Sequence, residues 1–252
     1  MKIKQSLPKR RQKIRSGLLM ISVLCFPMTI FMFSPMLSIY GASQGLVNAS
    51  VLVFTTLFVS SLFLGRAFCG WLCPCGGLQD WGCRINNTPL KRRRWIKFVV
   101  WVPWVTALSI LLVKNHAFGE INFFFPLKDG IFLHDVRSHI VYYMVIALFV
   151  FLTFVFGRRP FCHYLCWMAP FMIIGGKIRN RLQSPSLRIV ADRTRCDENC
   201  TICTENCSMS LNVDNMMVRL GDMEHTDCIL CGECVDVCPQ NALRYTFLKI
   251  PS

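Results

Sequence analysis

The last third of the chain contains eight cysteines whose spacing can hold iron–sulfur clusters. They form two runs, Cys196-x3-Cys200-x2-Cys203-x3-Cys207 and Cys228-x2-Cys231-x2-Cys234-x3-Cys238. The second run is followed by Pro239 and has the spacing of bacterial ferredoxins, in which thiolates hold [4Fe–4S] clusters. The first run repeats this spacing with one extra residue between its first two cysteines. The two runs predict two [4Fe–4S] clusters and therefore electron transfer.

The ligands of each cluster follow from a rule of two-cluster ferredoxins. In these proteins the fourth cysteine of each run binds the cluster of the other run. The predicted ligand sets are Cys207, Cys228, Cys231 and Cys234 for one cluster, and Cys196, Cys200, Cys203 and Cys238 for the other. Zinc sites also use Cys-x2-Cys pairs, but they usually combine two widely separated pairs, so the spacing favours clusters. A secreted disulfide framework is disfavoured because it needs a short, loop-rich chain.

A second cysteine pattern occurs twice in the first two thirds of the chain. Each copy follows a Gly-Arg pair and reads Phe-Cys-x-aromatic-Leu-Cys, with its cysteines at Cys69 and Cys73 or at Cys162 and Cys166. The copies are 93 positions apart, and each follows a long apolar stretch. This duplication predicts a two-fold internal repeat about an axis along the membrane normal.

The duplicated motif allows three interpretations. Cysteines four positions apart lie on one face of a helix, so the two copies together can place four thiolates at one site. Soft thiolates favour an iron–sulfur cluster, copper(I) or zinc. The alternatives are a redox-active dithiol and simple packing, because free cysteine is commonly buried. We predict a third metal or thiol redox site at Cys69, Cys73, Cys162 and Cys166. The remaining cysteines, Cys25, Cys75 and Cys83, are interpreted as packing residues.

Four apolar stretches predict an all-α membrane domain over residues 1–182. They cover residues 17–40, 46–64, 97–113 and 139–156, and each approaches the ~20 residues that a helix needs to cross a bilayer. The first stretch is too long for the apolar part of a signal peptide and no small-residue cleavage site closes it. We therefore expect four transmembrane helices, the first of them retained.

The positive charge of the chain lies beside these stretches. The formal net charge is +14, and Lys and Arg cluster in residues 1–16, 66–94 and 158–181. The positive-inside rule places these segments, and with them both termini, in the cytoplasm of a multi-pass protein of the prokaryotic inner membrane. Arg66, Arg158 and Arg159 are interpreted as topology determinants. Charge placed in this way favours membrane lipid, and not nucleic acid, as a partner.

Residues 183–252 predict a small cytoplasmic α+β domain of the bacterial 2[4Fe–4S] ferredoxin type. A segment of this size usually needs stabilising cross-links or metal sites in addition to its apolar core, and two clusters supply them. Short strands are expected near residues 187–190 and 242–247. No Gly/Ser-rich linker precedes the segment, so we expect it to be docked on the membrane domain.

The chain resembles the NapH-type ferredoxin-like membrane proteins in its four spans, its two Cys-x3-Cys motifs and its C-terminal double ferredoxin run. The wider relatives of these proteins are NosR, CcoG and MauN. The resemblance implies a quinol dehydrogenase membrane component that passes electrons to clusters on the cytoplasmic side or to a partner iron–sulfur protein. Two positions depart from the family pattern. Cys73 is followed by the usual proline, but Cys166 is followed by Trp167, and Ser208 stands where a proline often follows the first run.

These features predict a membrane-bound iron–sulfur protein that passes electrons between the quinone pool and a partner redox enzyme. Alternatives are an accessory protein that reduces or delivers a metal during metalloenzyme assembly, and a redox-sensing membrane regulator. A quinone site beside the Cys69 and Cys162 motifs, at the cytoplasmic face, avoids an electron path across the membrane. Ionisable residues in the connection between the third and fourth spans are interpreted as a solvated loop: His116, Glu120, His134, Asp135 and His139.

Overall fold

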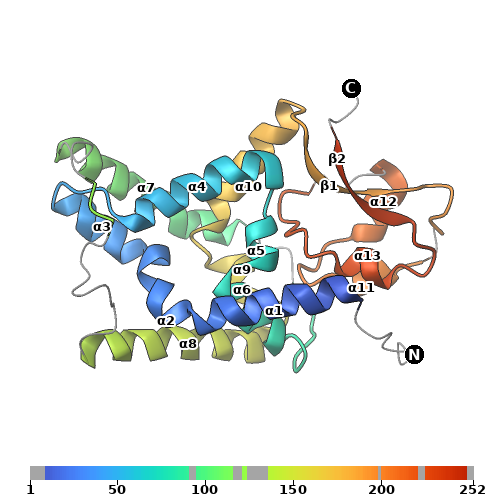
Figure 1. Ribbon diagram of the computed structural model, residues 1–252, viewed down its shortest axis with the longest axis horizontal. Helices are drawn as coiled ribbons and strands as arrows, with labels where there is room; N and C mark the ends of the chain where they lie inside the picture. The colour runs from blue at the N-terminus through green and yellow to red at the C-terminus, as the bar shows by residue number, and fades with distance from the viewer. Residues whose placement is uncertain are drawn as a thin grey trace.

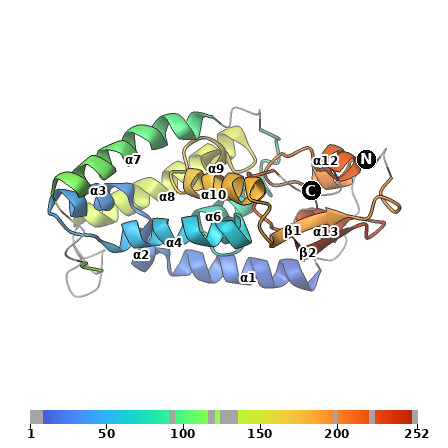
Figure 2. The ribbon, with the colours of Figure 1, turned by 90° about the horizontal axis from the view of Figure 1, so that it is seen from above.

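The molecule is elongated, with apolar helices at one end and a small sheet with short helices at the other (Figure 1). The computed structural model describes residues 9–90, 95–115, 121–123, 136–197, 200–220 and 225–248. We call residues up to 182 the helical half and residues from 183 the ferredoxin half. The long helices run along the long axis of the molecule in both views (Figures 1 and 2).

The first apolar stretch is not one continuous helix. It forms α1 (Arg10–Leu24), α2 (Phe26–Thr29), the 3-10 helix η1 (Ile30–Phe33) and α3 (Pro35–Ser43). Pro27 and Pro35 lack the backbone N–H that an unbroken helix needs. The residue before a proline also avoids the helical region, and Ser34 is extended, with ψ 121°. The prediction of a single helix across residues 17–40 was therefore wrong.

Three further long helices are α4 (Ala49–Leu64), α7 (Ile96–Lys114) and α8 (Val136–Phe156). By length and composition, α7 and the His139–Phe156 part of α8 are each sufficient to cross a membrane, whereas α4 is shorter. Most side chains of these two segments face outward, as Val113 and Phe151 do, which are 66% and 62% exposed. An outer surface of this kind fits contact with lipid.

Each copy of the duplicated motif begins in a short helix and leads into a second helix. The first copy forms α5 (Ala67–Trp71) and α6 (Pro74–Gly82), and the second forms α9 (Pro160–Tyr164) and α10 (Ala169–Arg181). The helix after each copy packs on the long helix that precedes the other copy: α6 contacts α8, and α10 contacts α4. In the same way α1 contacts α5 and α6, and α7 contacts α9 and α10. A two-fold relation between the copies would produce this pattern.

Two close helix crossings repeat this relation at equivalent positions. A Cβ placed on Gly82 of α6 would overlap Thr153 of α8, and one placed on Gly175 of α10 would overlap Ser61 of α4. Gly82 and Gly175 are 93 positions apart, the same separation as Cys69 and Cys162. Each crossing therefore depends on the small size of glycine.

The ferredoxin half contains an antiparallel pair of strands and three short helices. β1 (Ser186–Ala191) pairs with β2 (Leu243–Leu248) in a register that joins Ser186 to Leu248 and Ala191 to Leu243. The helices are α11 (Ile202–Glu205), α12 (Val213–Leu220) and α13 (Glu233–Val237). β1 covers the predicted residues 187–190, and β2 begins one residue after the predicted start at residue 242. A boundary at residue 182 falls between α10 and β1.

Candidate iron–sulfur sites

The eight cysteines of the ferredoxin half line two separate cavities. Cys207, Cys228, Cys231 and Cys234 line one of them together with apolar side chains such as Ile189, Met209 and Leu211. The other cavity is lined by Cys196, Cys200, Cys203 and Cys238. These are the same two sets of four that the ferredoxin rule groups. We call the first set the proximal site and the second set the distal site.

The thiols of both sites suit iron–sulfur clusters. Backbone N–H groups point at the sulfurs: Leu211 N lies 3.4 Å from Cys207 Sγ, and Ala242 N lies 3.4 Å from Cys238 Sγ. Such hydrogen bonds stabilise cluster thiolates and tune the reduction potential. Burial raises the pKa of the Cys207 thiol to about 11, so metal binding must displace its proton.

Single-ion sites are a poor match to this arrangement. Within the described ranges, no three His, Cys, Asp or Glu side chains are grouped closely enough to hold one metal ion. A [4Fe–4S] cluster is bound by four cysteines, each on a different iron, so its ligands lie farther apart than those of a single ion. The lining of the two cavities therefore fits clusters better than zinc.

The structure also brings the two Cys-x3-Cys motifs together in the helical half. Their four cysteines are all buried and close enough for their charges to influence one another: Cys69, Cys73, Cys162 and Cys166. Gln79 of α6 links the copies, because its Nε2 lies 3.4 Å from Cys162 Sγ while its Oε1 accepts a hydrogen bond from Phe161 N. We call these four residues the four-cysteine site.

Two buried arginines flank the four-cysteine site at equivalent positions of the repeat. Arg66 Nη1 donates to Asp227 Oδ1 at 2.9 Å, and Nη2 lies 4.0 Å from Cys69 Sγ. Arg159 Nε donates to Asp80 Oδ1 at 2.7 Å, and Nη1 donates to Cys69 O at 3.3 Å. Burial alone would lower the pKa of Arg66, but Cys69 and Asp227 raise this pKa above its usual range.

The sequence-based interpretation of these arginines missed their position. Arg66 and Arg159 are 1% and 0% exposed, and Arg158 is also buried, donating from Nη1 to Cys207 O at 3.2 Å. All three therefore make specific internal contacts, which their interpretation as topology determinants did not include. Arg66 and Arg159 are 93 positions apart, as Cys69 and Cys162 are, and this separation was the sequence signal that the two arginines occupy equivalent positions.

The four-cysteine site adjoins the proximal site. Gly70 packs against Ile229 so tightly that a Cβ on Gly70 would overlap the Ile229 carbonyl oxygen. Next to this contact, Trp71 Nε1 donates to Leu230 O at 2.9 Å. Arg66 adds the ion pair with Asp227, which directly precedes Cys228. The loop that carries two proximal cysteines is thus fixed against the first Cys-x3-Cys motif.

The other predicted positions lie outside these sites. Cys25 is exposed, Cys83 is half-buried, and Cys75 is buried beside Cys73. His139 is exposed near the start of α8. His116, Glu120, His134 and Asp135 lie outside the described residues.

Comparison with protein families gives the chain a coarse identity. A model of the 4Fe-4S binding domain matches residues 48–98 and 139–185, and a model of the 4Fe-4S dicluster domain matches residues 195–243. The chain is an iron–sulfur protein. Each stretch matched by the first model contains one copy of the Cys-x3-Cys motif, and the second model spans all eight cysteines of the ferredoxin half.

Similar proteins are known from archaea and bacteria. The uncharacterized protein MJ0750 of Methanocaldococcus jannaschii is 23% identical, over 81% of this chain and 82% of its own length. The regulatory protein NosR of Stutzerimonas stutzeri is 29% identical over 72% of this chain but only 24% of NosR. The putative electron transport protein YccM of Escherichia coli is 26% identical over 76% of this chain and 54% of YccM. The predicted relationship to NosR is thereby confirmed. No solved structure gives a significant match.

Proposed function

We propose that this iron–sulfur protein carries electrons between a membrane quinone and a soluble redox partner. Three centres act in series in this proposal. They are a thiolate centre at the four-cysteine site, a [4Fe–4S] cluster at the proximal site and a [4Fe–4S] cluster at the distal site. The similarity to YccM, which is named a putative electron transport protein, supports this role.

The observation that carries the proposal is the contact between the four-cysteine site and the proximal site. Gly70 and Ile229 each directly follow a cysteine of their own site, and their backbones touch. Gln12 and Arg158 of the helical half also donate to the backbone carbonyls of Cys231 and Cys207. Among the described residues, those that line the distal cavity all belong to the ferredoxin half. This difference supports the order of the three centres.

The charges around the four-cysteine site favour a metal–thiolate centre there. Among the described residues, two ion-pair networks flank it, in which four buried cations meet two carboxylates: Arg15, Arg66, Lys97 and Arg159 against Asp80 and Asp227. A further partner of Arg15, Glu233, lies at the exposed edge. Excess buried positive charge is costly unless an anionic group compensates it. Four thiolates around a doubly charged core carry a charge of −2 and would supply that compensation.

The proposed setting is the inner membrane of a prokaryote. We infer that α4, α7, α8 and the broken segment from α1 to α3 each cross the bilayer. The basic start of α1 contacts the ferredoxin half, since Arg11 pairs with Asp236. The positive-inside rule then places the clusters in the cytoplasm. Broken helices are tolerated in membranes where neighbouring elements satisfy the freed backbone groups.

The quinone is assigned to the cytoplasmic end of the helical half, near the four-cysteine site. Oxidation of one quinol releases two electrons and two protons, and two [4Fe–4S] clusters can take up one electron each. In this geometry the electrons do not have to cross the bilayer. The NapH-type role of quinol oxidation, which the sequence resemblance implies, is the form of the reaction that we propose.

The proposal is tested with the full chain in liposomes that contain a quinol. We expect the visible absorption of the clusters to bleach on quinol addition and to return when a soluble electron acceptor is added. Clusters that keep the same spectrum across the accessible range of potentials would contradict the proposal. A variant with Cys25→Ser, at an exposed cysteine outside all three sites, is the matched control and should behave as the wild type.

A redox-sensing regulator is the second candidate, because NosR is named a regulatory protein. A sensor needs a change in cluster state but no sustained electron flow. The two functions are separated by counting turnovers in the same liposomes. Many electrons delivered to the soluble acceptor per chain would support electron transfer, and a single change of cluster state without turnover would support the sensor.

A further inference from the structure

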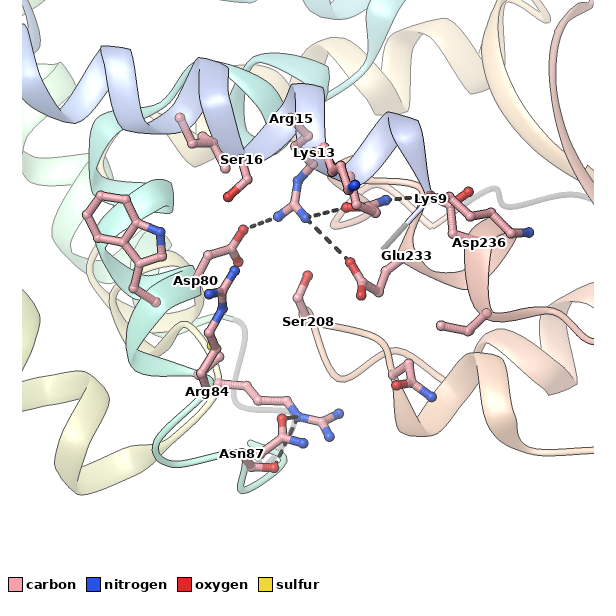
Figure 3. Close-up of a pocket in the computed structure, with 17 residues that line it drawn as sticks. Lys9, Lys13, Arg15, Ser16, Asp80, Arg84, Asn87, Ser208, Glu233 and Asp236 are labelled. Atoms are coloured by element: carbon pink, nitrogen blue, oxygen red, sulfur yellow. Dashed lines mark hydrogen bonds and ion pairs between the residues drawn. The ribbon is translucent and has the colours of Figure 1, made fainter. Parts of the chain in front are cut away.

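A large cavity lies where α1, α6 and the ferredoxin half meet (Figure 3). Its volume is about 740 Å³, within the ~300–1,000 Å³ range of small-molecule sites. Ser208 and Glu233 line both this cavity and the cavity of the proximal site. A molecule bound here would therefore touch both halves of the protein beside the proximal site.

The cavity carries an excess of positive charge. Its lining includes five cations and three carboxylates: Lys9, Lys13, Arg15, Arg84 and Arg158 against Asp80, Glu233 and Asp236. Arg15 lies between Asp80 and Glu233 and pairs with both (Figure 3). Asp236 is paired with Arg11.

Three cations of the cavity differ from Arg15 in their ion pairing and exposure. Within the described part of the chain, Lys9, Lys13 and Arg84 form no ion pair, and all three are exposed. Their charges therefore attract an anionic ligand into the cavity.

The surroundings of the cavity suit the apolar part of a lipid. Leu19 and Trp81 belong to its lining, and tryptophan is enriched at membrane–water interfaces. At the same level of α1, but on the side of the helix turned away from the cavity, Ile14, Leu18 and Ile21 are 50%, 37% and 59% exposed. Their spacing of four and three residues places them on one face of the helix. The cationic cavity and an apolar surface that fits lipid thus lie at the same level along α1.

We propose that this cavity binds the phosphate-bearing headgroup of an anionic phospholipid, whose acyl chains pass Trp81 into the bilayer. The inference rests on the membrane location given under the proposed function. Basic pockets on the cytoplasmic side of membrane helices bind such headgroups. Because the headgroup contacts both halves, it would help to hold the proximal site against the four-cysteine site.

The test measures lipid retention by native mass spectrometry on the full chain, after transfer from nanodiscs of phosphatidylcholine with some phosphatidylglycerol. A double variant, Lys13→Gln with Arg84→Gln, should retain phosphatidylglycerol roughly 25-fold less strongly, about fivefold for each charge near the surface. The matched control is Lys177→Gln, an exposed cation of α10 outside the cavity, and it should retain lipid as the wild type does. An equal loss in the control, or no loss in the double variant, would overturn the inference.

A free phosphate is the other source of the same chemistry. The delipidated chain in detergent is therefore heated with and without inorganic phosphate. Stabilisation by phosphate that the double variant lacks, without retention of phosphatidylglycerol, would assign the cavity to a soluble phosphate and overturn the lipid assignment. Reduction of the clusters by quinol is measured on the same samples. Selective lipid retention with clusters that quinol cannot reduce would uphold this inference while contradicting the proposed function.

Discussion

Gly70 and Ile229 pack against each other across the boundary between the helical and ferredoxin halves, with no space for a side chain on Gly70. A Cβ on Gly70 would overlap the Ile229 carbonyl oxygen and lie 3.4 Å from Cys231 N. Because Gly70 follows Cys69 and Ile229 follows Cys228, this contact joins the backbones of the two candidate redox sites. The first prediction concerns this contact.

Replacing Gly70 by alanine should loosen the docking of the ferredoxin half. The added methyl group must displace backbone, and overpacking of this kind costs about 1–3 kcal/mol. We expect a lower midpoint of thermal unfolding and slower cluster reduction by quinol, with unchanged iron content. Gly17→Ala is the control, since a Cβ there meets nothing within 4 Å. If both variants behave alike, the close contact has no role in docking.

Replacing Asp227 by asparagine should be strongly destabilising. The carboxylate pairs with Arg66 and Lys97, both 1% exposed. Breaking a buried pair leaves uncompensated charge and costs about 3–5 kcal/mol. Denaturant unfolding of the full chain measures the change. Asp192→Asn, at an exposed ion pair with Arg195, should leave stability unchanged. A loss no larger than that of the Asp192 variant would contradict the buried network.

The ligand sets predict which cysteine variants act on the same cluster. Cys207→Ser and Cys228→Ser should each remove about four of the roughly eight iron atoms of two clusters, and the double variant should remove no more. Combining Cys207→Ser with Cys203→Ser should remove the iron of both clusters. Iron analysis and electron paramagnetic resonance of the reduced protein measure the outcome. If instead the Cys207/Cys203 pair loses only one cluster, the crossed pairing is wrong.

The four-cysteine site predicts metal beyond that of the two clusters. Cys69→Ser or Cys162→Ser should lower the total metal content without removing the proximal and distal clusters, and should slow their reduction by quinol. Elemental analysis for iron, copper and zinc gives the first quantity. Cys25→Ser controls for loss of a thiol alone. Metal content that is identical in all three variants and the wild type would show that the buried thiols hold no metal.

The sequence predicts those features that depend on local spacing. The two sets of ferredoxin cysteines line two cavities, the two strands lie where they are expected, and α7 and α8 cover the third and fourth apolar stretches. In each case the signal is a spacing or a run of similar residues along the chain. Such signals need no knowledge of tertiary contacts.

The features that sequence reasoning missed depend on partners far away in the chain. The hydropathy of residues 17–40 indicates one continuous helix. Pro27 and Pro35 divide this stretch, because a proline has no backbone N–H to donate. Charge counting assigns Arg66 to a membrane surface, whereas Asp227, 161 positions later, holds it in the interior. The contact of Gly70 with Ile229 likewise depends on the docking of two halves, which no local pattern encodes.

The central claim is that electrons pass between the four-cysteine site and the distal cluster through the proximal cluster. It is tested most directly by following cluster reduction with rapid-freeze electron paramagnetic resonance after quinol addition to the full chain in liposomes. In a Cys203→Ser variant, which lacks the distal cluster, the proximal cluster should be reduced at the wild-type rate. In a Cys207→Ser variant, which lacks the proximal cluster, reduction of the distal cluster should be abolished. Reduction of the distal cluster at the wild-type rate in the Cys207 variant would contradict the account.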